Sequence, residues 1–164
     1  MTTSHPPGRT LGGLPLAAAL CAIAGGYPLV IMTGMIAFGY TVPGIDNRFA
    51  LMSYAAIMLT FMGAVHWGLA MLLPAAGDDI RFGSKRDWRA YASSMAPGLI
   101  AWLGLLMPAR AGAWLMVAGF GGLIVYDIRC MRMGEAPTWF IRLRLPLAIV
   151  ASAALIAGII LATP

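Results

Sequence analysis

Five long apolar runs that contain almost no charge constrain this chain more than any other feature. They cover about residues 11–40, 49–73, 91–107, 111–126 and 146–162. A helix needs about 20 mostly apolar residues to span a bilayer. The chain is 60% hydrophobic and 10% charged, whereas about a quarter of the residues of a soluble domain are charged. The sequence therefore predicts an all-α fold, one transmembrane domain over residues 1–164, built as a bundle of five transmembrane helices.

The basic residues indicate how this bundle is oriented. If the chain crosses five times, nine of its 11 Lys and Arg residues fall on one side, and only Arg48 and Arg110 fall on the other. Basic residues accumulate on the cytoplasmic face of a membrane. We therefore expect a bacterial inner-membrane protein with a cytoplasmic N-terminus and a periplasmic C-terminus. The positive charge is then a feature of membrane topology, and we expect no nucleic-acid partner.

Short connections and small residues predict close helix packing. Only Pro108, Ala109 and Arg110 join the third and fourth runs, so these helices should be antiparallel neighbours. In the fourth run, Ala118, Gly119 and Gly122 form a face of small residues, and such faces let membrane helices approach closely. The sequence leaves open whether this face packs within the chain or against a partner.

Within these boundaries no Asp, Glu, Lys or Arg lies inside any run. Proton relays and ion pathways usually need such groups within the membrane. The absence argues against a proton-coupled transporter or an ion channel.

His66 is the ionisable residue that does lie inside a run. Helical side chains lean toward the N-terminus, so His66 and Trp67 should lean across Gly63 and flank a recess. A hydrogen bond from His66 to a neighbouring helix is the structural interpretation, and a pocket for a quinone, haem or lipid headgroup is the functional one. A bis-histidine haem within one chain is not expected, because His5 in the polar N-terminal segment is the other histidine.

A second cluster precedes the fifth run. Trp139 suits the headgroup level of a membrane, and Arg142 and Arg144 are two residues apart, so on a helix they point in roughly opposite directions. One can reach a lipid phosphate while the other turns inward toward Asp127, but the sequence does not say which. An interfacial anchor with a structural ion pair and an anion site beside His66 are the two interpretations.

Neither metal binding nor disulfide formation is expected. Cys21 and Cys130 are far apart and form no CxxC pair, and most of the 12 methionines lie within the apolar runs, where methionine commonly fills cores. The start of the chain has features of a signal peptide, but Pro15, Pro28 and apolar character through Tyr40 argue against cleavage.

Two motifs carry a family resemblance. The segment ending Phe-x-Gly-x-x-x-Trp-Gly at Gly68 and the run Pro-x-Trp-Phe-x-x-Leu-Arg-x-Pro-Leu from Pro137 to Leu147 resemble the bacterial family of domain of unknown function 3429. That family includes the mitochondrial inner-membrane protein called transmembrane protein 69. The resemblance implies five spans and an inner membrane, and it brings no activity or catalytic residue.

Three functional hypotheses remain. The first is a non-enzymatic accessory subunit or assembly factor of a respiratory or photosynthetic membrane complex, with membrane lipids and other integral subunits as partners. The second is a binding or carrier protein for a hydrophobic cofactor, using Gly63, His66 and Trp67 with Arg142 or Arg144. No cofactor is required by the sequence, although a bound lipid, quinone or pigment is compatible with this recess. The third is an enzyme acting on lipid or isoprenoid, which clustered Asp, Glu or His residues at the membrane interface would favour. Asp127 and His66 are the one such pair in this sequence, and the sequence does not show that they meet.

Overall fold

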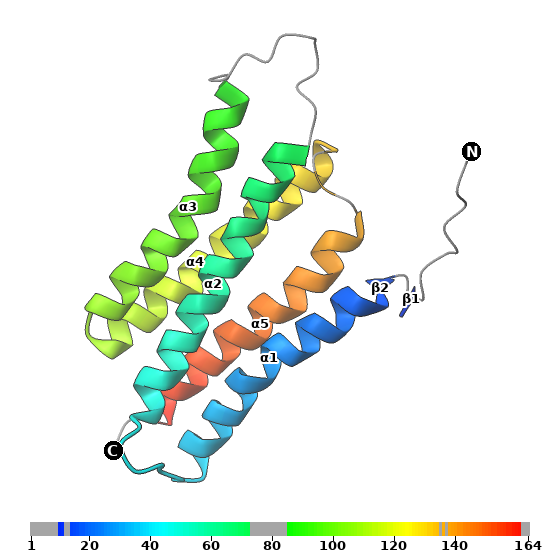
Figure 1. The fold of residues 1–164 in the computed structure, drawn as a ribbon. Helices are drawn as coiled ribbons and strands as arrows, with labels where there is room; N and C mark the ends of the chain where they lie inside the picture. Colours follow the sequence, from blue (N-terminus) through cyan, green and yellow to red (C-terminus); the bar gives the residue numbers. More distant parts are fainter. Residues whose placement is uncertain (1–9, 12–13, 73–84, 135, 137, 162–164) are drawn as a thin grey trace.

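The fold is a bundle of five helices (Figure 1). The computed structural model describes residues 10–11, 14–72, 85–134, 136 and 138–161. The helices are α1 (Leu16–Ala37), α2 (Asn47–Leu72), α3 (Lys85–Leu106), α4 (Ala109–Arg132) and α5 (Thr138–Ile160). Two strands of two residues each, β1 (Thr10–Leu11) and β2 (Leu14–Pro15), pair just before α1. Apart from this short pair of strands, the described elements are helices, which confirms the all-α prediction.

The helices run up and down in turn, and α2 is the central one. Each helix packs against the next along the chain, α5 closes the bundle against α1, and α2 also contacts α4 and α5. Figure 1 shows α1 and α5 side by side, with α2 between them and α3. Because Leu106 and Ala109 end and begin successive helices, α3 and α4 are antiparallel neighbours, as the short connection predicts.

The first helix is shorter at both ends than its apolar run. It begins at Leu16, directly after Pro15, rather than at residue 11. It ends before Gly39, whose φ of 68° is easily adopted only by glycine. The Gly39 amide donates to the Ile36 carbonyl and the Tyr40 amide donates to the Met35 carbonyl. This pair of bonds is a Schellman motif, which ends α1 although the apolar run continues to residue 40.

The fourth and fifth helices are longer than their apolar runs, and this overturns one expectation. Helix α4 continues past residue 126 to Arg132 and stops before Gly134, which has a φ of 73°. Helix α5 begins at Thr138, eight residues before Pro146. Asp127 and Arg144 therefore lie inside helices. The expectation of spans without charge is wrong, and the argument against a proton pathway that rested on it no longer holds.

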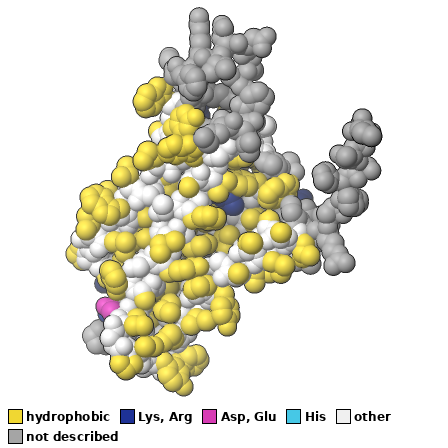
Figure 2. Space-filling view, in the orientation of Figure 1, with side chains coloured by type: hydrophobic (Ala, Val, Ile, Leu, Met, Phe, Trp, Pro, Cys, Tyr) yellow, Lys and Arg dark blue, Asp and Glu magenta, His cyan; other side chains and the backbone are white. Residues whose placement is uncertain are grey.

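Within the described residues, four helices are long and apolar enough to cross a membrane. The segments are Leu16–Ala37, Asn47–Leu69, Ala109–Arg132 and Trp139–Ile160. The apolar part of α3, Tyr91–Leu106, is shorter, because the helix begins with a polar turn. Figure 2 shows hydrophobic side chains over the face of the bundle in view, with few charged groups among them. Four spans are thus supported by length and composition, and a fifth crossing by α3 stays a prediction.

Glycines set the closest helix contacts. At Gly63 in α2, a Cβ atom would lie 2.7 Å from the Pro97 ring of α3. At Gly112 in α4, it would lie 1.9 Å from the Gly104 carbonyl oxygen of α3. These positions bring the backbones of α2 and α4 against α3, so small residues set the spacing of this side of the bundle.

Candidate functional site

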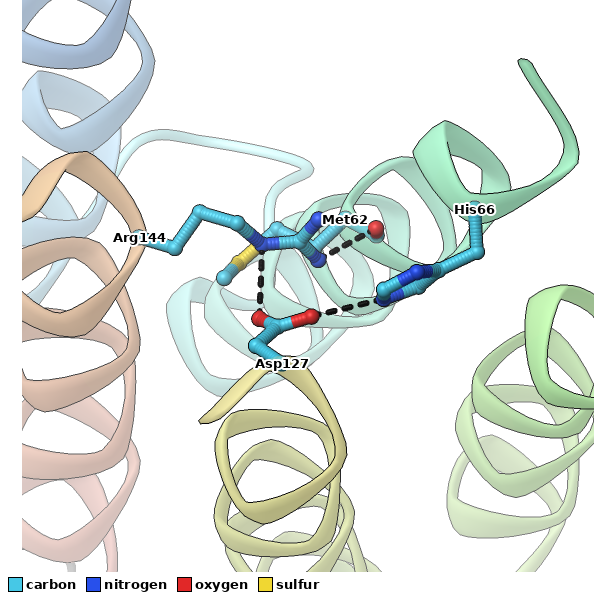
Figure 3. A network of polar contacts seen from close by, with 4 residues as sticks. All are labelled: Met62, His66, Asp127 and Arg144. Atoms are coloured by element: carbon cyan, nitrogen blue, oxygen red, sulfur yellow. Dashed lines mark hydrogen bonds and ion pairs between the residues drawn. The ribbon is translucent and has the colours of Figure 1, made fainter. Parts of the chain in front are cut away.

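Three ionisable side chains from three helices meet inside the bundle (Figure 3). Asp127 of α4 lies between His66 of α2 and Arg144 of α5, with one carboxylate oxygen toward each partner. His66 Nε2 is 2.6 Å from Oδ1 of Asp127. Arg144 Nε is 2.9 Å from Oδ2. The side chains are 3%, 0% and 4% exposed for His66, Asp127 and Arg144, so the cluster is sealed from the surroundings.

Arg144 also connects to the backbone of α2. Its Nη2 donates to the Met62 carbonyl oxygen, one turn before His66. The Nε contact to Asp127 is close, but the two atoms do not form an aligned hydrogen bond, so this contact is an ion pair. Among the described residues no acceptor is hydrogen-bonded to Nη1 of Arg144. The buried Nη1 group of the guanidinium thus has no hydrogen bond there, and Nε is held only by the ion pair to Asp127.

Aromatic rings surround the polar cluster. The Arg144 guanidinium carbon lies 4.6 Å from the centre of the Phe140 ring, one turn earlier on α5. The His66 ring meets Tyr126 edge-on, with centroids 4.8 Å apart. Phe140 and Cys130 are buried in a small apolar cluster, with Tyr126 packed against it, and Met62 belongs to the main core. Apolar groups therefore limit water access to the three charged or polar groups.

The charges in this cluster can balance. An ionised carboxylate only accepts hydrogen bonds, so His66 Nε2 donates to Asp127. With His66 neutral, Asp127 and Arg144 sum to zero charge, which makes burial among membrane helices tolerable. The arrangement can tie α2, α4 and α5 together. Its imidazole–carboxylate pair has the orientation that acid–base chemistry uses, but the pair is enclosed rather than open to a cleft.

The structure separates the residues that were expected to form a recess. His66 points inward to Asp127, whereas Trp67 is 44% exposed and meets Tyr91 of α3 edge-on. The space beside Gly63 is occupied by the Pro97 ring. No hollow is therefore left by Gly63 itself, and ligand binding there stays a prediction.

The two arginines of α5 differ as their spacing suggests, and the structure answers which one faces inward. Arg144 is buried against Asp127, and Arg142 is exposed. Trp139 is partly buried, and its ring lies edge-on to Phe140, with centroids 6.3 Å apart. The opposite charges of Asp127 and Arg144, near the same end of the bundle, were the sequence signal for this pairing. The anion-site interpretation placed His66 beside these arginines, but no sequence signal showed that His66 contacts Asp127.

Metal ligands do not gather in the part of the chain that the structure describes. There, no three His, Cys, Asp or Glu side chains lie close enough together to hold an ion. Cys21 is exposed on α1, and Cys130 is buried in α4. His5 lies outside the described residues.

Comparison with known proteins gives the family. Residues 14–160 match the family described as protein of unknown function DUF3429. The chain belongs to this family. Transmembrane protein 69 of Xenopus tropicalis is 33% identical over 117 residues, which cover 70% of this chain and 43% of that protein. The chain thus spans less than half the length of this curated relative. No solved structure matches this chain. The membrane-spanning helices, the family match and the similarity to this transmembrane protein identify the chain as an integral membrane protein.

Proposed function

We propose that this protein is a non-enzymatic accessory subunit or assembly factor of a larger respiratory or photosynthetic complex in the bacterial inner membrane. The observation that carries the proposal is an outward-facing patch of small residues on α4, formed by Ala118, Gly121 and Gly122. All three are exposed. Gly121 and Gly122 lie three and four residues after Ala118, so all three residues share one face of the helix.

Glycines of the same helix differ in what they contact. Gly119 is buried, and a Cβ there would lie 2.9 Å from side-chain atoms of both Leu59 and Ile100. At Gly121 and Gly122, a Cβ would meet nothing within 4 Å. Glycine in a helix interior costs roughly 0.5–1 kcal/mol relative to alanine. Packing within the chain explains Gly119 but not its two neighbours, and close approach of a partner helix would explain them.

The interior of the bundle supports a structural rather than a catalytic role. The ionisable side chains of His66, Asp127 and Arg144 contact one another and are buried. An enzyme needs its acid and base within reach of a substrate. These groups instead hold helices together, so the outer faces of the bundle are left for interaction.

The ends of the described helices support the proposed orientation. Arg48 and Arg110 each stand second in their helix, at the start of α2 and α4. The opposite end of the bundle carries four arginines of the described helices: Arg89 and Arg142 near the starts of α3 and α5, and Arg129 and Arg132 near the end of α4. This excess of basic residues favours a cytoplasmic N-terminus.

Native electrophoresis with mass spectrometry on mildly solubilised membranes tests the proposal. The wild-type protein should migrate with a larger complex, and the Gly121→Leu/Gly122→Leu variant should migrate alone. Neither leucine meets an obstacle within 4 Å at its Cβ, so the bundle should still fold. Gly34→Leu is the matched control, because a Cβ at Gly34 of α1 also meets nothing within 4 Å. A wild-type protein that migrates alone would refute the proposal, and a double variant that still co-migrates would refute the role of this face.

A second candidate function is binding of a hydrophobic cofactor, such as a quinone, at the buried cluster. The unpaired Nη1 donor of Arg144, counted over the described residues, favours it, because buried donors normally have an acceptor. Protein purified in mild detergent would then carry a ligand detectable by mass spectrometry, and Arg144→Lys would lose it. Protein that is ligand-free by this measurement would argue for a bound water at Nη1 instead.

A further inference from the structure

We infer that the bundle binds an anionic lipid at the end opposite the His66–Asp127–Arg144 cluster. A cavity of about 160 Å³ lies there between the starts of α2 and α4 and the end of α5. Arg48 and Arg110 both line it. These are the two basic residues that the charge pattern assigns to the side with little positive charge. This side of the membrane has few basic residues, and both of those that it has line the same cavity.

The walls of the cavity are apolar and buried. Leu51, Met52, Ala113 and Leu155 line it, and each is less than a tenth exposed. Cavities lined by apolar side chains stay dry, and one of about 150 Å³ takes up a benzene molecule. The cavity here can therefore hold a few methylene groups, but not a hydrated ion by itself.

Two arginines stand at the mouth of the cavity. Arg48, Ala109 and Arg110 line the cavity and are exposed. Helix α4 begins after Pro108 without a hydrogen bond from any capping side chain. Its first two residues line the cavity, so the positive end of its dipole lies at the same mouth. At the start of α2, in contrast, Asp46 Oδ1 already accepts from the amides of Arg48 and Phe49. We therefore assign the anion site to the guanidinium group of Arg110 and the start of α4, with Arg48 at the same mouth.

The position of the cavity fits a lipid. Arg48 and Arg110 are the second residues of their helices, and Gly158 and Ile159 are close to the last residue of α5. Helix ends of a spanning bundle lie near the headgroups. The phosphate of the lipid would lie at the arginines, while the first methylene groups of one of the lipid's acyl chains enter the cavity. A free phosphate offers the same charge but nothing to fill the apolar walls. The inference is independent of any partner complex.

Native mass spectrometry of the detergent-solubilised protein, titrated with phosphatidylglycerol or phosphatidylcholine, tests the inference. We expect one phosphatidylglycerol to bind at least tenfold more tightly than phosphatidylcholine. Arg48→Gln/Arg110→Gln should remove this preference, and Arg129→Gln/Arg132→Gln, at the other end of α4, should keep it. Ala109→Leu, which narrows the mouth without changing charge, should weaken phosphatidylglycerol binding.

Three results would overturn the inference. Equal binding of the two lipids by the wild-type protein would show that the site does not select an anion. Unchanged phosphatidylglycerol binding by Arg48→Gln/Arg110→Gln would place the lipid elsewhere. Displacement of the lipid by an equal concentration of inorganic phosphate, with Ala109→Leu binding as well as wild type, would leave an ion site in which the cavity has no part.

Discussion

The two ends of the bundle use arginine in opposite ways. Toward one end, Arg144 is buried, and its charge is matched by Asp127. At the other end, Arg48 and Arg110 line the exposed mouth of an apolar cavity. The first arrangement ties helices together, and the second places two arginines at an exposed mouth, where we infer that an anionic lipid binds. Burial and pairing, rather than residue type, thus decide whether an arginine contributes to stability or to binding.

The strongest test of this comparison removes the central charge. Asp127→Leu leaves Arg144 buried without its counter-ion, and breaking a buried pair in this way costs about 3–5 kcal/mol. We expect the free energy of unfolding, measured by denaturant titration in mixed micelles with tryptophan fluorescence, to fall by that amount.

The double variant Asp127→Leu/Arg144→Met is its control. Apolar residues that replace both members of a buried pair are often neutral, so most of the lost stability should return. If the double variant is as unstable as Asp127→Leu, the volume of the site rather than its charge matters.

The two arginines of α5 give the next largest difference. Arg144→Gln removes the ion pair but leaves His66 beside Asp127, so we expect a loss of about 2–3 kcal/mol. Arg142→Gln changes an exposed side chain and should stay within about 0.5 kcal/mol of wild type. The same micelle titration measures both. Equal losses would mean that Arg144 is not paired in the membrane.

Packing glycines give a smaller difference within α4. Gly112→Ala brings a Cβ against the Gly104 backbone, and overpacking of this kind costs about 1–3 kcal/mol. Gly121→Ala meets nothing within 4 Å and should be neutral or stabilising by less than about 1 kcal/mol. Thermal unfolding monitored by circular dichroism compares them. A destabilising Gly121→Ala in the isolated protein would contradict the open face on α4.

Much of the fold could be predicted from the sequence, because apolar runs and tight connections are local signals. The order of the helices and the pairing of α3 with α4 follow from the runs and from the short turn at Pro108. The helix ends were less predictable, since hydropathy and backbone geometry change at different residues: α1 ends before its apolar run does, and α4 ends after it. Helix α4 continues through Asp127, where apolar character ends, until Gly134 adopts a positive φ.

The polar cluster was harder to predict because its members are distant in sequence. His66 and Asp127 are 61 residues apart, and Met62 and Arg144 are 82 apart. Their meeting depends on how three helices rotate about their axes, which the spacing of each helix alone does not fix. Opposite charges near one end suggested the Asp127–Arg144 pair. Nothing local indicated that Pro97 would fill the space beside Gly63.

The smallest expected effect lies at the open end of the bundle. Arg110→Gln removes a charge from an exposed residue, and among the described residues no buried acid pairs with it. The free energy of unfolding should therefore change by less than about 0.5 kcal/mol. The same substitution at Arg144 should cost several times more, and the micelle titration measures both variants under one condition. Because only the environments of the two arginines differ, this pair of variants isolates the effect of burial and pairing. A loss at Arg110 as large as that at Arg144 would mean that the open end also depends on a matched charge, and the contrast between the two ends would fail.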